Sequence, residues 1–409
     1  MLFELKRISM KKIKVKKINI KCGVIVKYLW YRAFIMISSL ILTIGCSEKD
    51  SDSESSSSSS SSSSSESSSS TFTVSEISQT VGSDGYFSGS FTLPSDSISF
   101  ILSIFRDNNG ATAFYSVSDP DGIDILSSSS TPNLNSVATG STGSWGYANV
   151  LVPQSPSFSA KPGNWSFKAY TNDRVKLMLR TGINPSVVTI QVQPYITGTT
   201  WTTGDLTETL SIMQNIYSRN GITLSINDTI TISDSQYAAV SGSFTDTTTA
   251  ALVSQGITDA VNLFFIEDYA GSWSGVLGNA AGIPGSLGDT NAWNGVLNSL
   301  TAHASGNTIN AQLLGETASH EMGHQLGLFH TTERGGTYFD ILSDTSECAK
   351  SDRDNNSDGL VSAEECEGYG SENIMFWTAW SASSRSQGKT QEILSDSQQQ
   401  ILKNSPIAK

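Results

Sequence analysis

The sequence predicts an all-β sandwich domain followed by an α+β domain, and two observations predict this order. Over residues 71–185, short runs with period-two hydrophobic alternation recur between turn sequences, which is typical of strands with one buried face. From residue 186 onward, strand-like runs alternate with segments of helical spacing, which indicates a domain that combines both kinds of element. A chain of 409 residues has room for two such domains and for further segments.

The candidate strands of the sandwich are short and separated by turns. Trp165, Phe167 and Ala169 occupy every second position of one of them. The sequences DNNG and DPDG supply Asp, Asn and Gly residues, which tolerate the backbone angles of turns. Seven strands within this length favour a β-sandwich. The predicted strands are Thr71–Ser78, Tyr86–Leu93, Ser97–Asp107, Ala111–Val117, Gly146–Val152, Asn164–Tyr170 and Arg174–Arg180.

The second domain, predicted over residues 186–409, opens with a strand at Val187–Ile196 and a helix at Asp205–Arg219. Apolar side chains recur every three or four residues in that helix, and Gly221 after it provides a C-terminal stop. Further strands are predicted within Ile222–Ile232 and Val261–Ile266.

Residues 1–45 predict an export signal. They carry ten Lys or Arg and one acidic residue, and they end in the apolar or small-residue run Ala33–Gly45. That run is shorter than the about 20 residues that a membrane span needs. Gly45-Cys46 resembles the bacterial lipobox, so we expect Cys46 to be lipidated and to become the new N-terminus. The alternative is an uncleaved signal anchor in which Cys46 has no role.

Residues 46–70 predict a tether, because they are almost entirely Ser and have too little apolar surface to fold. From residue 46 onward the chain carries 15 basic and 37 acidic residues, a net charge of −22. Membrane attachment would therefore depend on acyl chains, since this charge repels anionic headgroups. The same acid excess argues against nucleic acid as a partner. Only 15% of residues are charged, which is typical of secreted or cell-surface proteins.

The sequence HEMGHQLGLFH carries the strongest candidate site. His320 and His324 are four residues apart, so on a helix they share one face and can bind one metal ion. Glu321 lies next to His320, within reach of a water on that ion. Gly327 permits the left-handed turn that ends a helix, and this turn returns His330 as a third imidazole. Three neutral imidazoles leave one zinc position open for water, as in catalytic sites.

This sequence resembles the zinc motif of the metzincin metalloendopeptidases. The resemblance implies a mixed, twisted sheet with an active-site helix. It also implies a Met-turn beneath the zinc, and the sequence Asn-Ile-Met ending at Met375 is suited to it. Some metzincins add a Tyr ligand two residues later; Trp377 stands there, so we expect no fifth protein ligand. The fourth histidine, His303, has no spacing partner, and we expect it at the surface.

The reaction that the resemblance implies is metal-assisted hydrolysis of a peptide bond. Zinc lowers the pKa of its bound water to about 7. Glu321 would accept a proton as this water attacks the carbonyl, and would then pass the proton to the leaving amine. The sequences NAAGIPGSLGD and NGVLNSL resemble the edge strand and the next strand of that fold, and the edge strand binds an extended peptide by β-addition. The residues expected on the substrate edge strand are Ala281, Gly282, Ile283 and Pro284.

Three further resemblances refine this picture. HTTERGG and DILSDTSEC resemble the pappalysin-like branch of metzincins, and LSDSQQQILKNSP resembles a common C-terminal metzincin helix. SDPDG and KPGNWSFKAY resemble jelly-roll domains that accompany many bacterial secreted proteases. For the sandwich we therefore expect a spacer or substrate-docking role, with a carbohydrate-binding site as the alternative.

The sequence DNNSDGLVSAEE at residues 354–365 matches the 12-residue calcium loop of EF-hands. Oxygen-bearing side chains occupy positions one, three, five and nine, with Gly at six and Glu at twelve. Convincing flanking helices are lacking, so we expect an isolated Ca²⁺ loop inside the domain. Asp352 is an alternative first ligand, and a solvated acidic loop is the alternative to a site. The expected ligands are Asp354, Asn356, Asp358, Leu360, Ser362 and Glu365.

The cysteines divide into three groups. Cys22 leaves with the signal and Cys46 is acylated, so Cys348 and Cys366 remain to pair in an oxidising compartment. Closing a loop of this size would stabilise the fold by about 3 kcal/mol in the chain-entropy model.

We therefore expect a bacterial surface lipoprotein, monomeric and outer-membrane or surface exposed, that uses zinc and calcium to cleave protein or peptide substrates. Release from the cell is the alternative location. The alternative functions are a non-catalytic zinc-binding adhesin or docking protein and a peptidase that acts only on its own chain. Glu321 argues against the adhesin, because a purely structural zinc site needs no base.

Overall fold

The computed structural model describes residues 70–126, 143–170 and 173–409, all of which fall within one compact unit. The predicted export signal, Cys46 and all of the predicted tether except Ser70 lie outside the described residues. Among the described residues, no helix is both long and apolar enough to cross a membrane.

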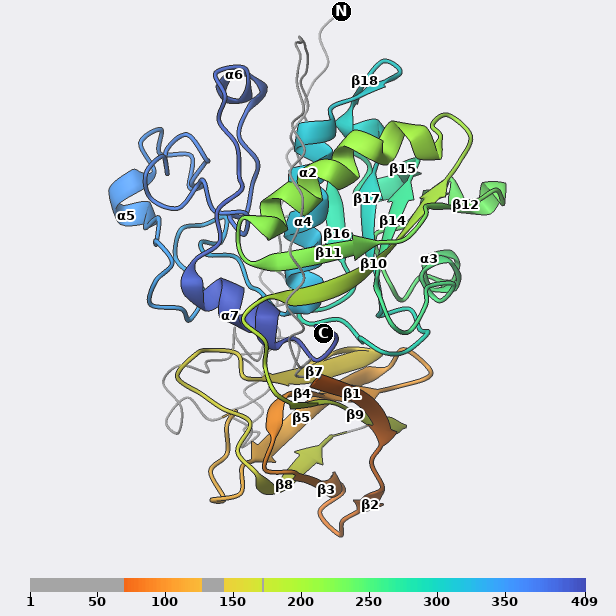
Figure 1. The fold of residues 1–409 in the computed structure, drawn as a ribbon, viewed down its shortest axis with the longest axis vertical. Helices are drawn as coiled ribbons and strands as arrows, with labels where there is room; N and C mark the ends of the chain where they lie inside the picture. The colour runs from red at the N-terminus through yellow and green to blue at the C-terminus, as the bar shows by residue number, and fades with distance from the viewer. Residues whose placement is uncertain (1–69, 127–142, 171–172) are drawn as a thin grey trace, which may run out of the picture. The chain divides into compact units, whose positions relative to one another are not determined.

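The N-terminal part is a sandwich of two antiparallel sheets, in the lower part of Figure 1. Its strands are β1 Ser70–Glu76, β2 Gln79–Val81, β3 Phe87–Leu93, β4 Ser97–Phe105, β5 Ala111–Ser118, β6 Gly143–Trp145, β7 Tyr147–Val152, β8 Gly163–Ala169 and β9 Arg174–Gly182. One sheet has the order β1-β9-β4-β7 and the other β2-β3-β8-β5-β6. In β8, the alternating Trp165, Phe167 and Ala169 are buried in the core between the sheets, which confirms the predicted sandwich.

The C-terminal part is built on a mixed sheet, which confirms the predicted α+β domain. Its strands are β10 Val188–Thr197, β11 Ile222–Ile226, β12 Ile230–Ile232, β14 Val261–Ile266, β16 Gly278–Ala280 and β17 Val296–Ser299. The order is β11-β10-β14-β17-β16, and β12 also pairs with β10. All pairs are parallel except β16 with β17, so β16 is an antiparallel edge strand. The predicted run Ile222–Ile232 is therefore two strands, β11 and β12.

Two long helices cover one face of this sheet (Figure 1): α2 Thr207–Ser218 and α4 Ala311–Leu326. The helices approach closely because Gly315 has no side chain; a Cβ there would lie 2.7 Å from Ile212 Cγ2. The hydroxyl of Tyr217 on α2 also donates to the carbonyl of Ser319 on α4 at 3.0 Å. One hydrophobic core joins the sheet to α2 and α4, and α3 (Thr247–Val253) contributes to a second cluster that contains Phe264.

The remaining elements are short. The strand pairs are β13 Ala239–Val240 with β15 Asp268–Tyr269 and β18 Ala304–Ser305 with β19 Thr308–Ile309. The 3₁₀ helices are η2 Thr203–Leu206, η3 Ser235–Tyr237, η4 Gly271–Trp273 and η5 Thr301–His303, and the other helices are α5 Lys350–Arg353, α6 Ala382–Arg385 and α7 Asp396–Asn404. The long segment between α4 and α7 is thus largely loop, and α7 begins with a capping box between Ser395 and Gln398.

Candidate metal centre

Helix α4 carries the first two predicted ligands, His320 and His324, and it ends just before the segment that carries the third, His330. The helix starts at Asn310, whose side chain accepts a hydrogen bond from the Leu313 amide. It stops at Gly327, which has a φ of 113°, and the Leu328 amide bonds back to the Gly323 carbonyl. This left-handed turn reverses the chain, so that residues after it return toward the helix.

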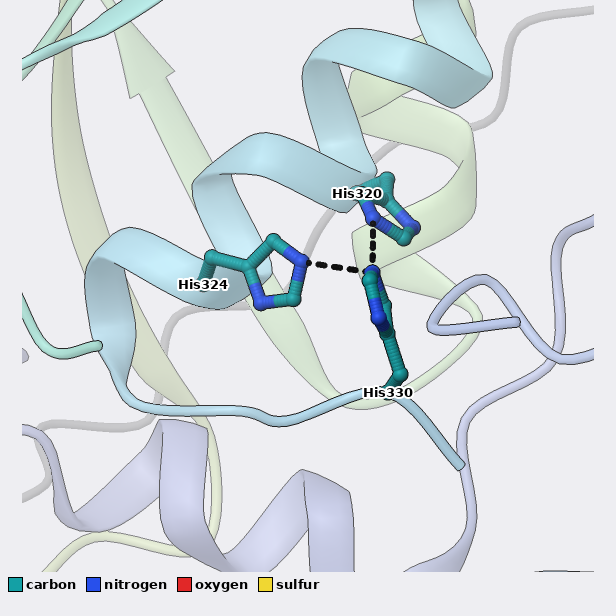
Figure 2. A group of neighbouring side chains, drawn as sticks. All are labelled: His320, His324 and His330. Atoms are coloured by element: carbon teal, nitrogen blue, oxygen red, sulfur yellow. Dashed lines mark hydrogen bonds between the residues drawn. The ribbon is translucent and has the colours of Figure 1, made fainter. Parts of the chain in front are cut away.

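The three predicted ligands converge (Figure 2). Nε2 of His330 lies 3.2 Å from Nε2 of His320 and 3.1 Å from Nε2 of His324. The part of the chain that the structure describes holds no other group of three or more His, Cys, Asp or Glu side chains close enough to share an ion. The predicted histidines thus form one compact nitrogen cluster.

The second nitrogen of each imidazole has a partner outside the nitrogen cluster. Nδ1 of His320 lies 2.6 Å from the Ile374 carbonyl, and Nδ1 of His324 lies 2.7 Å from the Leu328 carbonyl. Nδ1 of His330 instead lies 3.1 Å from a carboxylate oxygen of Glu333. Such partners hold Nδ1 protonated and direct Nε2 toward the shared point. The sequence analysis did not predict this role of Glu333, although an acidic residue three positions after the last ligand could have indicated it.

Burial keeps two of the imidazoles neutral. It lowers the pKa of His320 to about 3, with the neighbouring His330 acting in the same direction, and it lowers the pKa of His324 well below its ordinary value. Burial also acts to lower the pKa of His330, but the charge and hydrogen bond of Glu333 outweigh it and raise that pKa. Neutral imidazoles are the form that binds a metal ion.

Glu321 is a buried carboxylate next to the cluster, on the side of the edge strand. Burial raises its pKa to about 8, while His330 and the backbone N–H of Ala280 act to lower it. Gly278 on β16 faces the same side chain, since a Cβ there would lie 2.6 Å from Glu321 Cγ. A glycine at this position therefore leaves the space that the carboxylate occupies.

Met375 lies beneath α4, as a Met-turn residue would. It is fully buried, and a Cβ on Gly323 would lie 2.5 Å from its sulfur. The turn is closed by the Asn373 side chain, which accepts from the Met375 amide at 2.8 Å. Its Ile374 carbonyl is the partner of His320, so the turn orients a ligand as well as supporting the helix. The indole of Trp377 donates to the Val361 carbonyl at 2.7 Å.

The predicted edge-strand residues need a correction in their bounds. The strand is Gly278–Ala280, and it ends before Ala281, Gly282, Ile283 and Pro284. The Ala281 amide still bonds to the Gly295 carbonyl at 3.1 Å, and the chain then turns away. The strand begins at Gly278, three residues before the first expected residue, Ala281. It does not extend through the expected residues because Gly282 and Pro284 disfavour a strand.

The expected surface position of His303 was wrong. The side chain is 2% exposed, and its ring nitrogens contact the Ser299 carbonyl at 2.5 Å and Thr317 Oγ1 at 2.9 Å. Burial lowers its pKa to about 4. His303 is therefore a neutral core residue that joins β17 to α4.

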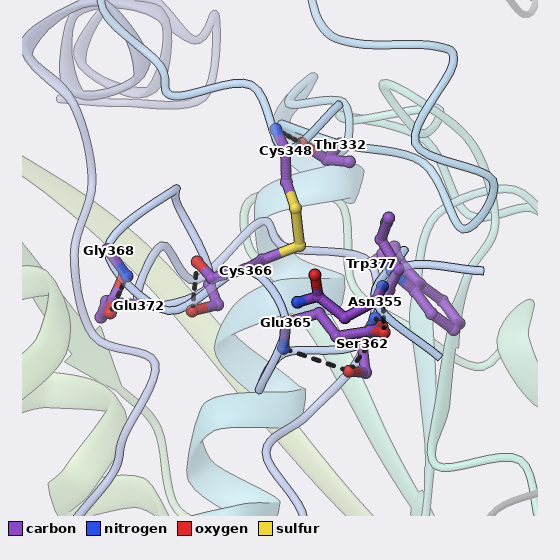
Figure 3. The surroundings of a disulfide bond; sticks show 11 residues. Thr332, Cys348, Asn355, Ser362, Glu365, Cys366, Gly368, Glu372 and Trp377 are labelled. Atoms are coloured by element: carbon purple, nitrogen blue, oxygen red, sulfur yellow. Dashed lines mark hydrogen bonds between the residues drawn. A yellow bond between two sulfur atoms is a disulfide. The ribbon is translucent and has the colours of Figure 1, made fainter. Parts of the chain in front are cut away.

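Cys348 and Cys366 form a disulfide, as expected, and it brackets the predicted calcium loop (Figure 3). Within that loop Glu365 accepts from the amides of Asn355, Asn356 and Ser362 at 2.9 to 3.3 Å. The other expected ligands are also engaged with the loop backbone: Asp354 accepts from Gly359, Asn356 from Asp358, and Asp358 from Leu360. Alternative first ligand Asp352 is exposed.

Two comparisons with known proteins agree with this geometry. Residues 205–331 match the family described as metallo-peptidase family M12B, reprolysin-like. The matched segment contains Glu321 and the three histidines of the nitrogen cluster. An extracellular metalloprotease of Podospora anserina is 30% identical over 148 residues, which cover 35% of this chain and 49% of that protein. The chain thus spans about half the length of the curated relative it matches.

Proposed function

We propose that this protein is a zinc metalloendopeptidase that cleaves protein substrates outside the cell. The observation that carries the proposal is the convergence of three imidazole Nε2 atoms beside the buried carboxylate of Glu321. The family match over residues 205–331 supports the same reaction class. The sequences HTTERGG and DILSDTSEC, which begin at His330 and follow it, support a place in the pappalysin-like branch of metzincins.

The donor set fits zinc. Three imidazole nitrogens with fixed Nδ1 partners suit a tetrahedral ion that keeps one position open. A bound zinc supplies a Lewis acid for the scissile carbonyl and a water of lowered pKa. His320, His324 and His330 would hold it.

The base in this proposal is Glu321. Its carboxylate accepts the proton of the attacking water and returns it to the leaving amine. The Ala280 N–H and the open space at Gly278 keep this carboxylate beside the edge strand. The base is thereby placed next to the strand on which a substrate would lie.

Strand β16 would position the substrate. It is paired on one side with β17 and forms the end of the sheet. An extended peptide can add to such an edge through main-chain hydrogen bonds. Ala281, Gly282, Ile283 and Pro284 would continue the substrate-binding rim beyond the strand.

A calcium ion in the loop at residues 354–365 is part of the proposal. Asp354 at position one is only 7% exposed in its side chain, and its Oδ1 is buried with no hydrogen-bond partner. A buried carboxylate oxygen without a partner is costly unless a cation binds it. Asn356, Asp358, the Leu360 carbonyl, Ser362 and Glu365 complete the proposed ligand set.

Attachment through a lipidated Cys46 and a tether over residues 46–70 completes the proposal. The relative from Podospora anserina is named an extracellular metalloprotease, which supports a location outside the cell. The disulfide between Cys348 and Cys366 supports an oxidising compartment as well. We place the protein on a bacterial surface as a monomer.

The test is hydrolysis of casein by the purified chain, abolished by a zinc chelator and restored by added zinc. Glu321→Gln should retain zinc and lose activity by about 100-fold or more, since it removes the base but no ligand. A parent protein that binds zinc but cleaves nothing would favour the non-catalytic adhesin. Undiminished cleavage by the Glu321→Gln protein would refute the mechanism.

A further inference from the structure

Strand β7 of the sandwich is buried on both of its faces. Ala148, Val150 and Val152 point into the sandwich core. Tyr147, Asn149 and Leu151 lie at the alternate positions, and they contact the peptidase domain instead. A strand of a two-sheet sandwich normally exposes its outer face, so this second buried face indicates a dedicated contact.

Two buried amide side chains reach from the sandwich to backbone carbonyls of the peptidase domain. Asn149 donates to the Pro284 carbonyl at 2.7 Å, and Gln154 donates to the Gly327 carbonyl. Both side chains are 2% exposed. Pro284 follows the edge strand, and Gly327 is the glycine of the zinc motif, so both acceptors lie within a few residues of the site.

The apolar contacts concentrate at the same two places. A Cβ on Gly327 would lie 2.5 Å from Leu151 Cδ2, and one on Gly282 would lie 3.0 Å from the Tyr147 ring. The Tyr147 ring also stacks on Trp293, with centroids 5.5 Å apart. Gly327 is thus required by its positive φ and also by the sandwich side chain that lies against it.

Polar contacts extend the interface on either side. Lys176 pairs with Asp289 in the loop after the edge strand. Arg180, which is 1% exposed, donates to the carbonyls of Lys403 and Ser405 at the C-terminal end of α7. A spacer domain needs none of these buried bonds.

We propose that the sandwich is a working part of the peptidase, in which Asn149 and Gln154 are positioning residues for peptide hydrolysis. Asn149 holds the segment after β16, and Gln154 holds the turn that carries the chain from α4 to His330. This inference rests on the proposed peptidase function. It replaces the spacer and carbohydrate-binding roles considered from the sequence with a structural role in the site.

The physical basis is the cost of an under-satisfied buried carbonyl. Removing the amide of Asn149 leaves the Pro284 oxygen with only the longer hydrogen bond from the Tyr147 hydroxyl, at 3.4 Å, which favours conformations that let the segment move to water. The edge strand would then be ordered only when a peptide binds. Part of the binding free energy of the substrate would be used to order the strand, so the substrate binds more weakly, while the zinc ligands and Glu321 stay in place.

The experiment compares Asn149→Ala and Gln154→Ala with the parent and with Val117→Ala, all in the full chain. Val117 is fully buried in the sandwich core on β5, in the sheet that does not contain β7. Its truncation weakens the sandwich without touching the interface. The readouts are KM and kcat on a fluorogenic casein-derived peptide, bound zinc, and amide hydrogen exchange of residues 278–294 and 323–330.

We expect Asn149→Ala to raise KM by about fivefold or more, with kcat changed by less than about twofold and zinc content unchanged. Exchange over residues 281–289 should become faster. Gln154→Ala should speed exchange around Gly327 and also lower kcat, because His330 follows that turn. Val117→Ala should lower thermal stability and change neither KM nor the exchange of these segments.

Unchanged KM and exchange in both amide variants would overturn the inference, as would an equal rise of KM in Val117→Ala. If Asn149→Ala does not fold, Asn149→Asp tests the same bond, because a carboxylate cannot donate to the Pro284 carbonyl. If the parent itself cleaves no peptide, the proposed peptidase function fails, and hydrogen exchange alone then decides whether the sandwich holds these segments.

Discussion

The candidate zinc centre and the proposed calcium loop both consist of residues from a short motif, but their candidate ligand atoms are held differently. Each imidazole has an Nδ1 partner outside the nitrogen cluster, such as Ile374 for His320 and Glu333 for His330. In the loop, Glu365 is occupied by amides of the loop itself, while Asp354 Oδ1 has no partner.

This difference teaches how each site would respond to its metal. The imidazoles are oriented by groups that do not compete with zinc, so their geometry precedes the ion. The side-chain oxygens of the loop already accept hydrogen bonds from amides of the same loop. A calcium ion would therefore have to rearrange them. We therefore expect zinc to bind a preformed site and calcium to change the loop that it binds.

The largest expected effect is the loss of a zinc ligand. His324→Ala should lower zinc affinity by more than the about 100-fold that outer contacts cost, and should abolish activity. Zinc content after dialysis against a chelator measures this. His303→Gln is the matched control, since His303 is buried but lies outside the cluster, and it should retain one zinc. Equal zinc loss in both proteins would contradict the assigned ligands.

Calcium should act through stability. A free Ca²⁺ concentration about 100 times the Kd should stabilise the parent by about 2.7 kcal/mol, measured as a shift in urea or thermal unfolding. Asp354→Asn should weaken this stabilisation, because it removes the carboxylate at position one. Asp352→Asn is the control and separates the two possible first ligands. If the stabilisation by calcium disappears only in the Asp352→Asn protein, Asp352 and not Asp354 is the first ligand of the loop.

A smaller effect on the zinc centre is expected at Glu333. Glu333→Gln keeps the shape of the side chain but removes the charge beside His330, so zinc affinity should fall by about tenfold. Competition with a colorimetric chelator gives the value. Glu367→Gln removes an acid that pairs with Lys389 instead, and should leave the affinity unchanged. An unaltered zinc affinity in Glu333→Gln would show that the Glu333 carboxylate does not contribute to zinc binding.

The last effect concerns the pH dependence of stability rather than metal binding. Burial raises the pKa of Asp340 to about 7, and the charges of Asp344 and Glu347 act in the same direction. The folded protein therefore binds this proton more tightly than the unfolded chain, whose Asp pKa is about 3.9. Its contribution to stability is present at low pH and is lost as pH rises from about 4 through 7.

Asp340→Asn should flatten that dependence, which urea unfolding at pH 5, 6, 7 and 8 would measure. The variant should lose less stability than the parent between pH 5 and 8. Asp344→Asn is a useful comparison, since the pKa of Asp344 is lowered rather than raised. An identical pH dependence in the parent and Asp340→Asn would contradict the assignment.

The sequence predicted those parts of the site that depend on local geometry. His320 and His324 share a helix face because of their spacing, and Gly327 ends that helix where His330 must return. The sandwich strands were predictable because alternation is local as well. His303 was misplaced because its partner Thr317, 14 residues away on α4, is set by how the chain folds back. Glu333 was missed even though it is only three residues from His330.

The sequence by itself therefore predicted the three histidines that cluster, the cysteines of the disulfide and the class of each domain, and it singled out Glu321 as the candidate base. Tertiary structure alone decided that β16 ends at Ala280, that Glu321 lies beside Gly278, and that Asn149 reaches Pro284. The physical reason is distance along the chain. Helical and strand periodicity report contacts within a few residues, whereas a hydrogen bond across 135 residues is fixed only when two separately folded surfaces meet.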